Sequence, residues 1–231
     1  MKKSLFLIAS LLSAVNALFA QDCSSYYYFK KNVEVEMSVL DQKGQPIAKN
    51  IHKVLSISKE GGVTVSEFTM ITKDGQGNQV SSSKGVYKCT GTEILMDMKK
   101  FLPDFSPLKD MKMESNGSAL ISYPLNMKEG QTLPDGSLQM SGNANGMDMN
   151  LECTVTDRKV AAREKVTTGG GSWDCFKITC KMNVIVKMMA MNIPVEMTIT
   201  QWFAPGFGVV KVRTDKEGSA ISIIEVTHVK K

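Results

Sequence analysis

The sequence predicts an all-β fold, built as a single antiparallel barrel or a strongly curved half-barrel sheet. Two observations carry this prediction. Apolar and polar residues alternate through most of the chain, and turn residues interrupt the alternation at short intervals. A period of two places one set of side chains on a core face and the other in water. Short strands joined by tight turns favour antiparallel pairing.

The expected strands follow in chain order. In 33–39, three valines and a methionine alternate with two glutamates and a serine. In 147–156, Met147, Met149, Leu151, Cys153 and Val155 alternate with polar residues, which is the clearest pattern in the chain. Further strands are expected at 47–58, 63–72, 79–89, 92–98, 160–168, 173–190, 194–204, 207–214 and 219–229. Glycine-containing turns between them supply the positive φ that hairpins need, at 43–46, 61–62, 74–78 and 216–218.

Residues 99–136 break the alternation. Four prolines interrupt any regular element there: Pro103, Pro107, Pro124 and Pro134. Leu102, Phe105, Leu108 and Met111 have near-helical spacing. We therefore expect a short helical or irregular segment around residues 99–115 that covers an open end or edge of the sheet.

The first 20 residues are typical of a cleaved signal peptide. Two lysines precede an apolar run that is too short to span a membrane. We expect cleavage after Ala20, with a competing site after Ala17, and a single all-β domain over 21–231. The protein is then exported to the periplasm or to the cell surface, where it can associate with the outer membrane. No later apolar run is long enough to span a membrane.

The charge of the chain argues against nucleic acid as a partner. Cleavage after Ala20 removes Lys2 and Lys3 and lowers the formal net charge from +5 to +3. The remaining lysines are dispersed along the chain, whereas nucleic-acid binding normally needs a clustered basic face.

Five cysteines follow the expected cleavage site, in a compartment where disulfides persist. A Cys23–Cys89 bond would tie down the new N-terminus. Cys175 and Cys180 are five positions apart, so on one strand they face opposite sides and cannot pair with each other. Cys153 could pair with Cys180 across the interior or with Cys175, and both alternatives stay open. A hairpin turn at 169–171 would place Cys153 opposite roughly residue 187.

The sequence predicts no catalytic residue, cofactor site or metal site. Only two histidines are present, His52 and His228, and neither has a recognisable catalytic partner. A catalytic cysteine would need a nearby base. The chain also lacks a nucleophile elbow, a phosphate loop and a dinucleotide fingerprint. We therefore expect the protein not to be an enzyme, and a hydrolase is the most distant alternative.

Methionine is the one compositional signal with functional potential, since the chain has 16 methionines and only 7% aromatic residues. Thioethers fill irregular cores, adapt to varied apolar ligands and can bind Cu(I). Core packing is the commonest of these roles, and copper is disfavoured because histidines are scarce. The candidate lining of an apolar cavity is Met96, Met98, Met147, Met149, Met188 and Met191.

Five short motifs occur in order along the chain: residues 23–30 (CSSYYYFK), 97–102 (DMKKFL), 130–136 (GQTLPDG), 172–178 (SWDCFKI) and 202–211 (WFAPGFGVVK). Together they resemble the TapB-like family, exported envelope proteins related to a domain of unknown function. The resemblance implies an exported all-β domain with no established activity and no assigned catalytic residues. Gly169–Gly171 departs from the family, which more often has a proline-containing turn there. Within the last motif, 204–206 is expected to form a tight connection anchored by Trp202 or Phe203.

Two functions follow as hypotheses. The first is a non-enzymatic binding module whose concave face takes an apolar small molecule, lipid or peptide, an idea supported by a fold-level analogy with periplasmic lipoprotein carriers. The second is a structural or interaction component of an envelope assembly, with a filled core and an exposed edge as its working surface. The sequence does not predict the oligomeric state.

Overall fold

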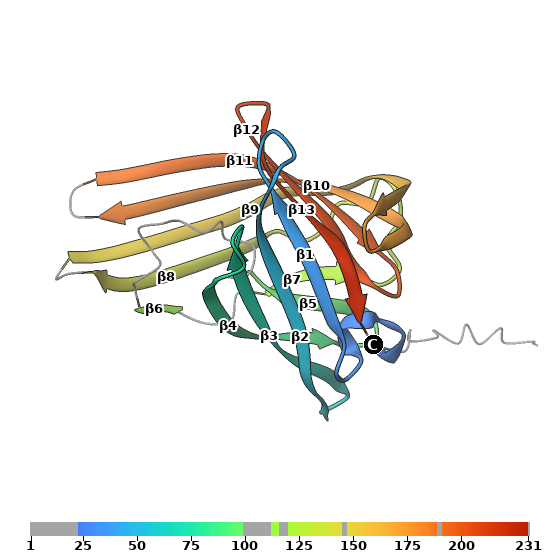
Figure 1. The fold of residues 1–231 in the computed structure, drawn as a ribbon. Coiled ribbons are helices and arrows are strands. Elements are labelled where there is room, and N and C mark those ends of the chain that lie inside the picture. Colours follow the sequence, from blue (N-terminus) through green and yellow to red (C-terminus); the bar gives the residue numbers. More distant parts are fainter. Residues whose placement is uncertain (1–22, 99–111, 116–119, 145–146, 189–190, 231) are drawn as a thin grey trace, which may run out of the picture.

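A computed structural model describes residues 23–98, 112–115, 120–144, 147–188 and 191–230. They form one antiparallel sheet of 13 strands in the order β6-β8-β9-β10-β11-β12-β13-β1-β2-β3-β4-β5-β7 (Figure 1). The strands are β1 (Glu34–Leu40), β2 (Pro46–Glu60), β3 (Val63–Asp74), β4 (Gln79–Cys89), β5 (Glu93–Asp97), β6 (Lys112–Ser115), β7 (Leu120–Pro124), β8 (Gly136–Ala144), β9 (Met147–Thr168), β10 (Gly171–Met188), β11 (Met191–Ala204), β12 (Gly208–Lys216) and β13 (Ser219–Lys230). The predicted all-β, strongly curved antiparallel sheet is confirmed. The expected signal peptide and residues 99–111 lie outside the described residues.

The prediction that 99–136 lacks strands is wrong. Both β6 and β7 lie within it, and β8 follows at Gly136. Pro124 is the last residue of β7, where a proline is tolerated because the strand ends there. The expected strands 147–156 and 160–168 are one continuous strand of 22 residues, β9.

A β-bulge explains this continuity. Asp157 and Arg158 of β9 together face Cys180 of β10, because Thr179 pairs with Lys159 and Lys181 pairs with Thr156. Asp157 has a φ of 54°, the left-handed conformation that bulges often contain. The bulge switches the alternation by one residue, so that Arg158 is buried and Asp157 is exposed.

Two irregularities in the pairing of β9 with β10, of which this bulge is one, change which residues lie opposite each other. Cys153 lies opposite Val184 and not near residue 187, because the extra residues of β9 displace its register with β10. A second irregularity lies between Lys177 and Ile178 of β10.

The two ends of the sheet approach each other through the segment that follows β7. Gly130 donates its backbone N–H to the Val160 carbonyl at 2.8 Å, and Val160 donates to the Gln131 carbonyl at 2.9 Å. Leu133 donates to the Arg158 carbonyl at 2.8 Å. These bonds connect the chain beyond the edge strand β7 with β9, so the sheet is nearly closed into a barrel.

The N-terminal segment packs into the barrel. It consists of two 3₁₀ turns, η1 (Cys23–Ser25) and η2 (Tyr27–Phe29), and the residues from Tyr26 to Phe29 are all buried. The Tyr28 ring contacts the rings of His52 and Tyr87. Its carbonyl accepts a hydrogen bond from the Ser66 hydroxyl at 2.6 Å. This end of the interior is therefore filled by aromatic side chains of the protein itself.

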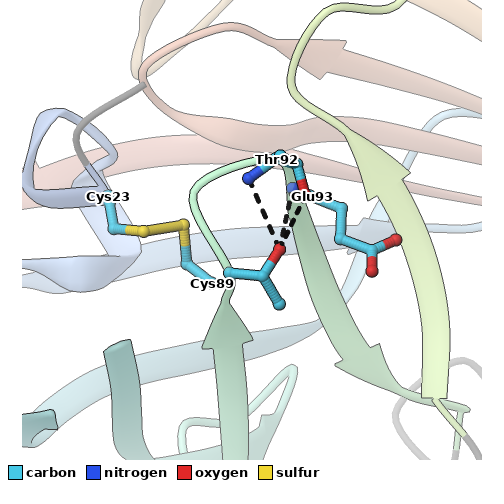
Figure 2. Close-up of a disulfide and its surroundings, with 5 residues drawn as sticks. Cys23, Cys89, Thr92 and Glu93 are labelled. Atoms are coloured by element: carbon cyan, nitrogen blue, oxygen red, sulfur yellow. Dashed lines mark hydrogen bonds between the residues drawn. A yellow bond between two sulfur atoms is a disulfide. The ribbon is translucent and has the colours of Figure 1, made fainter. Parts of the chain in front are cut away.

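A disulfide holds this segment in place. Cys23 is bonded to Cys89, the last residue of β4 (Figure 2). The turn after Cys89 is stabilised by the Thr90 hydroxyl, which accepts hydrogen bonds from the backbone N–H groups of Thr92 and Glu93. The bond links the N-terminal segment to the sheet across a sequence separation of 66 residues.

Strands β8 to β11 extend beyond the rest of the sheet and form an arm (Figure 1). Strand β12 pairs with β11 only from Thr198 onward, so the described part of β11 from Met191 to Met197 has a neighbour on one side alone. Pro194 lies in this stretch with one free edge, where the loss of a backbone donor is best tolerated.

Candidate functional site

The hairpin between β9 and β10 curls back onto β13. Gly170 donates its N–H to the Val226 carbonyl at 3.1 Å, and the Thr168 hydroxyl donates to the same carbonyl. A Cβ on Gly170 would lie 2.6 Å from Cγ1 of Val226, so only glycine permits this approach. Strand β13 is four places from β9 in the sheet. The five strands from β9 to β13 are therefore curved into a roll, in which the β9–β10 hairpin contacts β13.

A pocket of about 350 Å³ lies in this roll. Strands β9, β11, β12 and β13 all contribute to its lining, which comprises Glu164, Lys165, Val166, Trp202, Lys211, Arg213 and Ile223. Its volume falls in the range of small-molecule sites. The pocket is open to solvent, and aromatic, aliphatic and charged side chains share its wall.

Trp202 is the central side chain of the pocket. Its indole N–H donates to Oε1 of Glu164 at 2.5 Å. Trp202 pairs with Lys177 on β10 and with Lys211 on β12, and the Nζ atoms of these lysines lie 5.8 Å and 5.9 Å from its ring centroid. A desolvated cation contributes more to such a contact than an exposed one. The ring is thus fixed by one hydrogen bond and two flanking ammonium groups.

Three of the charged residues that line the pocket, Glu164, Lys211 and Arg213, form ion pairs. Nζ of Lys211 lies 2.8 Å from Glu225, and Nζ of Lys177 lies 3.8 Å from Glu164. Arg213 donates from Nε and Nη2 to Asp215. These side chains keep part of their surface in water, so each pair contributes little to stability and can be rearranged at small cost.

A second polar cluster lies in the barrel interior. Arg158 is fully buried and donates from Nη1 to the Pro134 carbonyl at 2.6 Å and from Nη2 to the Ser122 carbonyl at 3.0 Å. The Tyr123 hydroxyl donates to Oε1 of Gln201 at 2.8 Å, and burial raises the pKa of Tyr123. Arg158 thus joins β9 to β7 and to the segment before β8. Its described partners are neutral acceptors, which suits a structural role.

Three cysteines outside the disulfide are buried free thiols: Cys153, Cys175 and Cys180. Neither pairing considered for Cys153 is present. Burial raises the pKa of the Cys153 and Cys180 thiols to about 11 and that of Cys175 to about 12. Thiols with such pKa values stay protonated at neutral pH and are poor nucleophiles.

Five of the six candidate methionines lie in two places. Met96 and Met98 lie in the main core, 4% and 1% exposed. Met149, Met188 and Met191 form one row across β9, β10 and β11 of the arm, because Met188 pairs with both of the others. The row runs from buried Met149 to Met191, which is 53% exposed. Met147 is the first residue of β9, and its side chain lies outside the description.

In the described part of the chain, no three histidine, cysteine, aspartate or glutamate side chains gather in a way that could hold a metal ion. Among the same residues, no helix is long and apolar enough to cross a membrane.

A family profile described as DUF3108-like matches residues 30–225. The chain belongs to the DUF3108-like family. The narrower TapB-like assignment stays a prediction. No curated protein matches the sequence.

Two solved structures share the fold of this DUF3108-like chain. One is a Bacteroides fragilis protein assigned as exported, with a YmcC-like fold; the TM-score is 0.73 at 19% identity, over 89% of this chain and 99% of that one. The other is a Parabacteroides distasonis protein assigned as a lipoprotein; the TM-score is 0.72 at 17% identity, over 91% of this chain and 100% of that one. At these identities the likeness shows the fold alone.

The pocket of this DUF3108-like chain is not among the sites expected from the sequence. Of the two residues expected to anchor the 204–206 connection, Phe203 is buried in the core, whereas Trp202 faces the pocket. Trp202 lies between Gln201 and Phe203 in the sequence, so no local signal indicated its charged cross-strand neighbours, Lys177 and Lys211. Recognising the pocket also required knowing that β9 reaches β13, which no local pattern indicates.

Proposed function

We propose that this DUF3108-like chain is a non-enzymatic exported envelope protein that binds a small molecule in the Trp202 pocket. The observation that carries the proposal is the pocket of about 350 Å³ in the roll of β9 to β13. A site of this size with an aromatic wall and a few polar groups suits a small ligand. Export is supported by the two similar structures, which are assigned as an exported protein and a lipoprotein.

We place the ligand in the pocket and not at the core methionines, because the two places differ in how much apolar surface they expose. Met96 and Met98 pack against other core side chains and leave almost no exposed surface. Trp202, Val166 and Ile223 instead present apolar surface to an open space. The apolar part of a ligand therefore finds its contacts at these three side chains.

The chemistry of the thiols supports binding over catalysis. Cys153, Cys175 and Cys180 are buried, and their raised pKa values keep them protonated at neutral pH.

Native mass spectrometry of the protein purified from its own envelope tests the proposal. We expect the wild type to retain a small molecule that Trp202→Ala loses. Trp173→Phe is the matched control, because Trp173 packs on Phe207 and does not line the pocket. A wild-type protein with the mass of the polypeptide alone, or an adduct that survives Trp202→Ala, would contradict a ligand in this pocket.

The alternative role in an envelope assembly is favoured by the arm. Met191 and Ile193 are 53% and 46% exposed on the stretch of β11 that lacks a second neighbour. A strand with one free edge and exposed apolar residues can pair with an extended segment of another protein. In that case, cross-linking from position 191 would capture one stable protein partner, and Ile193→Lys would abolish the capture without affecting a ligand bound at Trp202.

A further inference from the structure

We infer that the Trp202 pocket selects a small amphiphilic anion, a molecule with an apolar body and one carboxylate, sulfonate or phosphate group. This inference rests on the proposed function and assigns the chemical class of its ligand. It depends on three features of the pocket: cationic donors on β12 that no described contact uses, an apolar wall beside them, and a single lining carboxylate that is already engaged.

The donors belong to Lys211 and Arg213. These residues are two positions apart on β12 and both line the pocket, so their side chains leave the same face of the strand. Arg213 contacts Asp215 through Nε and Nη2, and none of its described hydrogen bonds uses Nη1. Lys211 has one ion-pair partner, Glu225, for an ammonium group with three donors. Two neighbouring cations thus keep N–H groups for an anionic head.

The apolar wall adjoins these donors. Trp202 pairs directly with Lys211, so its indole lies beside the lysine. Val166 and Ile223 supply aliphatic surface from β9 and β13. A ligand whose head contacts β12 can therefore rest its apolar body on the indole. The tryptophan ring also contributes its area at low entropic cost, because it is held by Glu164.

The remaining carboxylate disfavours a cationic ligand. Glu164 is the one acidic residue that lines the pocket. It already accepts the indole N–H of Trp202 and lies 3.8 Å from Nζ of Lys177. A cation would have to replace these contacts and approach Lys211 and Arg213. An anion meets the opposite situation: three cationic residues line the pocket, and Lys211 and Arg213 on β12 keep N–H donors beyond their ion pairs.

Fluorescence of Trp202 provides the test. The chain has two tryptophans, so Trp173→Phe leaves Trp202 as the single reporter. The probes are 8-anilinonaphthalene-1-sulfonate, an aromatic sulfonate, and N-phenyl-1-naphthylamine, a neutral molecule with a similar ring system. We expect the sulfonate to quench Trp202 emission saturably and to bind at least about tenfold more tightly than the neutral probe, as two charge-assisted hydrogen bonds imply.

Charge variants locate the effect. Lys211→Gln and Arg213→Gln should each weaken sulfonate binding by about threefold to tenfold and leave the neutral probe unchanged. Lys49→Gln is the control, because Lys49 is ion-paired and about as exposed as Arg213 but lies on β2. Competition with decanoate and with 2-naphthoate then distinguishes an aliphatic from an aromatic body, and displacement by either supports the inference.

Two results would overturn the inference, and they bear differently on the proposed function. If both probes quench Trp202 equally and the charge variants bind as the wild type does, the pocket binds ligands without selecting anions, and the proposed function stands. If neither probe changes Trp202 emission while thermal unfolding shows that all variants are folded, the inference and the proposed pocket both fail.

Discussion

The guanidinium of Arg158 lies over the ring of Tyr123, with its central carbon 5.1 Å from the ring centroid and both side chains fully buried. Its two terminal nitrogens bind carbonyls on either side, at Ser122 and Pro134. The near-closure of the barrel depends on this residue, since it joins β9 to the chain at the opposite edge of the sheet.

Replacement of Arg158 should therefore destabilise the fold. Arg158→Ala removes a cation–π contact and the donors to the Ser122 and Pro134 carbonyls, and it opens a cavity at a fully buried position. We expect it to lower the free energy of unfolding by about 3 kcal/mol in a urea titration. Arg163→Ala is the control, because Arg163 lies on the same strand but is exposed. Equal stability of the two variants would contradict the role assigned to Arg158.

The disulfide should stabilise the N-terminal segment. Cys23→Ser combined with Cys89→Ser releases a loop closed over a separation of 66 residues, for which chain entropy gives about 4 kcal/mol. Dithiothreitol should lower the stability of the wild type to that of the double variant and leave the variant itself unchanged. An equal effect of the reductant on both proteins would contradict the stabilisation assigned to the Cys23–Cys89 disulfide.

The approach of Gly170 to Val226 should control the roll that contains the pocket. Gly170→Ala places a methyl group 2.6 Å from Cγ1 of Val226, so the hairpin must move away at a cost of about 1–3 kcal/mol. Gly169→Ala is the neighbouring control, because its nearest contact would be 3.4 Å, to the Thr227 carbonyl. The first variant should lose stability and probe binding together. Unchanged probe affinity in Gly170→Ala would separate the pocket from the hairpin contact.

The buried thiols predict a loss of stability in alkali. Above pH 9 the unfolded chain releases its thiol protons first, because burial raises the pKa of Cys153, Cys175 and Cys180 from 9.0 to about 11, 12 and 11. The unfolded state then binds fewer protons, so the free energy of unfolding falls from about pH 9 towards pH 12. The triple alanine variant should show a shallower decline. Parallel curves for the two proteins would disprove this linkage.

Local patterns predict most strands of this fold, because a half-buried sheet imposes alternation on residues such as Val33–Val39 and Met147–Val155. They fail where a structure departs from period two. If the alternation of Met147–Val155 continued along the strand, Asp157 would face inward. The bulge at Asp157 turns Arg158 inward instead, so Arg158 could not be recognised as a core residue. Strands β6 and β7 were not predicted from the sequence, because they are short and lie among prolines.

The pocket illustrates a different limit. Its residues come from four strands, and they meet only because Gly170 contacts Val226 across 56 positions of sequence. Nothing in the spacing of Glu164, Trp202 and Lys211 indicates that they share a wall. Cys23 and Cys89 are a contrasting case, since few cysteines and a free terminus made their pairing one of a small number of alternatives.

The central claim is that a small molecule occupies the pocket at Trp202, and ¹⁹F NMR of protein labelled with 5-fluorotryptophan tests it most directly. The chain has two tryptophans and should give two signals, assigned with Trp173→Phe. On titration with 8-anilinonaphthalene-1-sulfonate, we predict that the Trp202 signal shifts saturably and the Trp173 signal shifts little. A Trp202 signal that does not move, while the probe is bound elsewhere on the folded protein, would contradict the account.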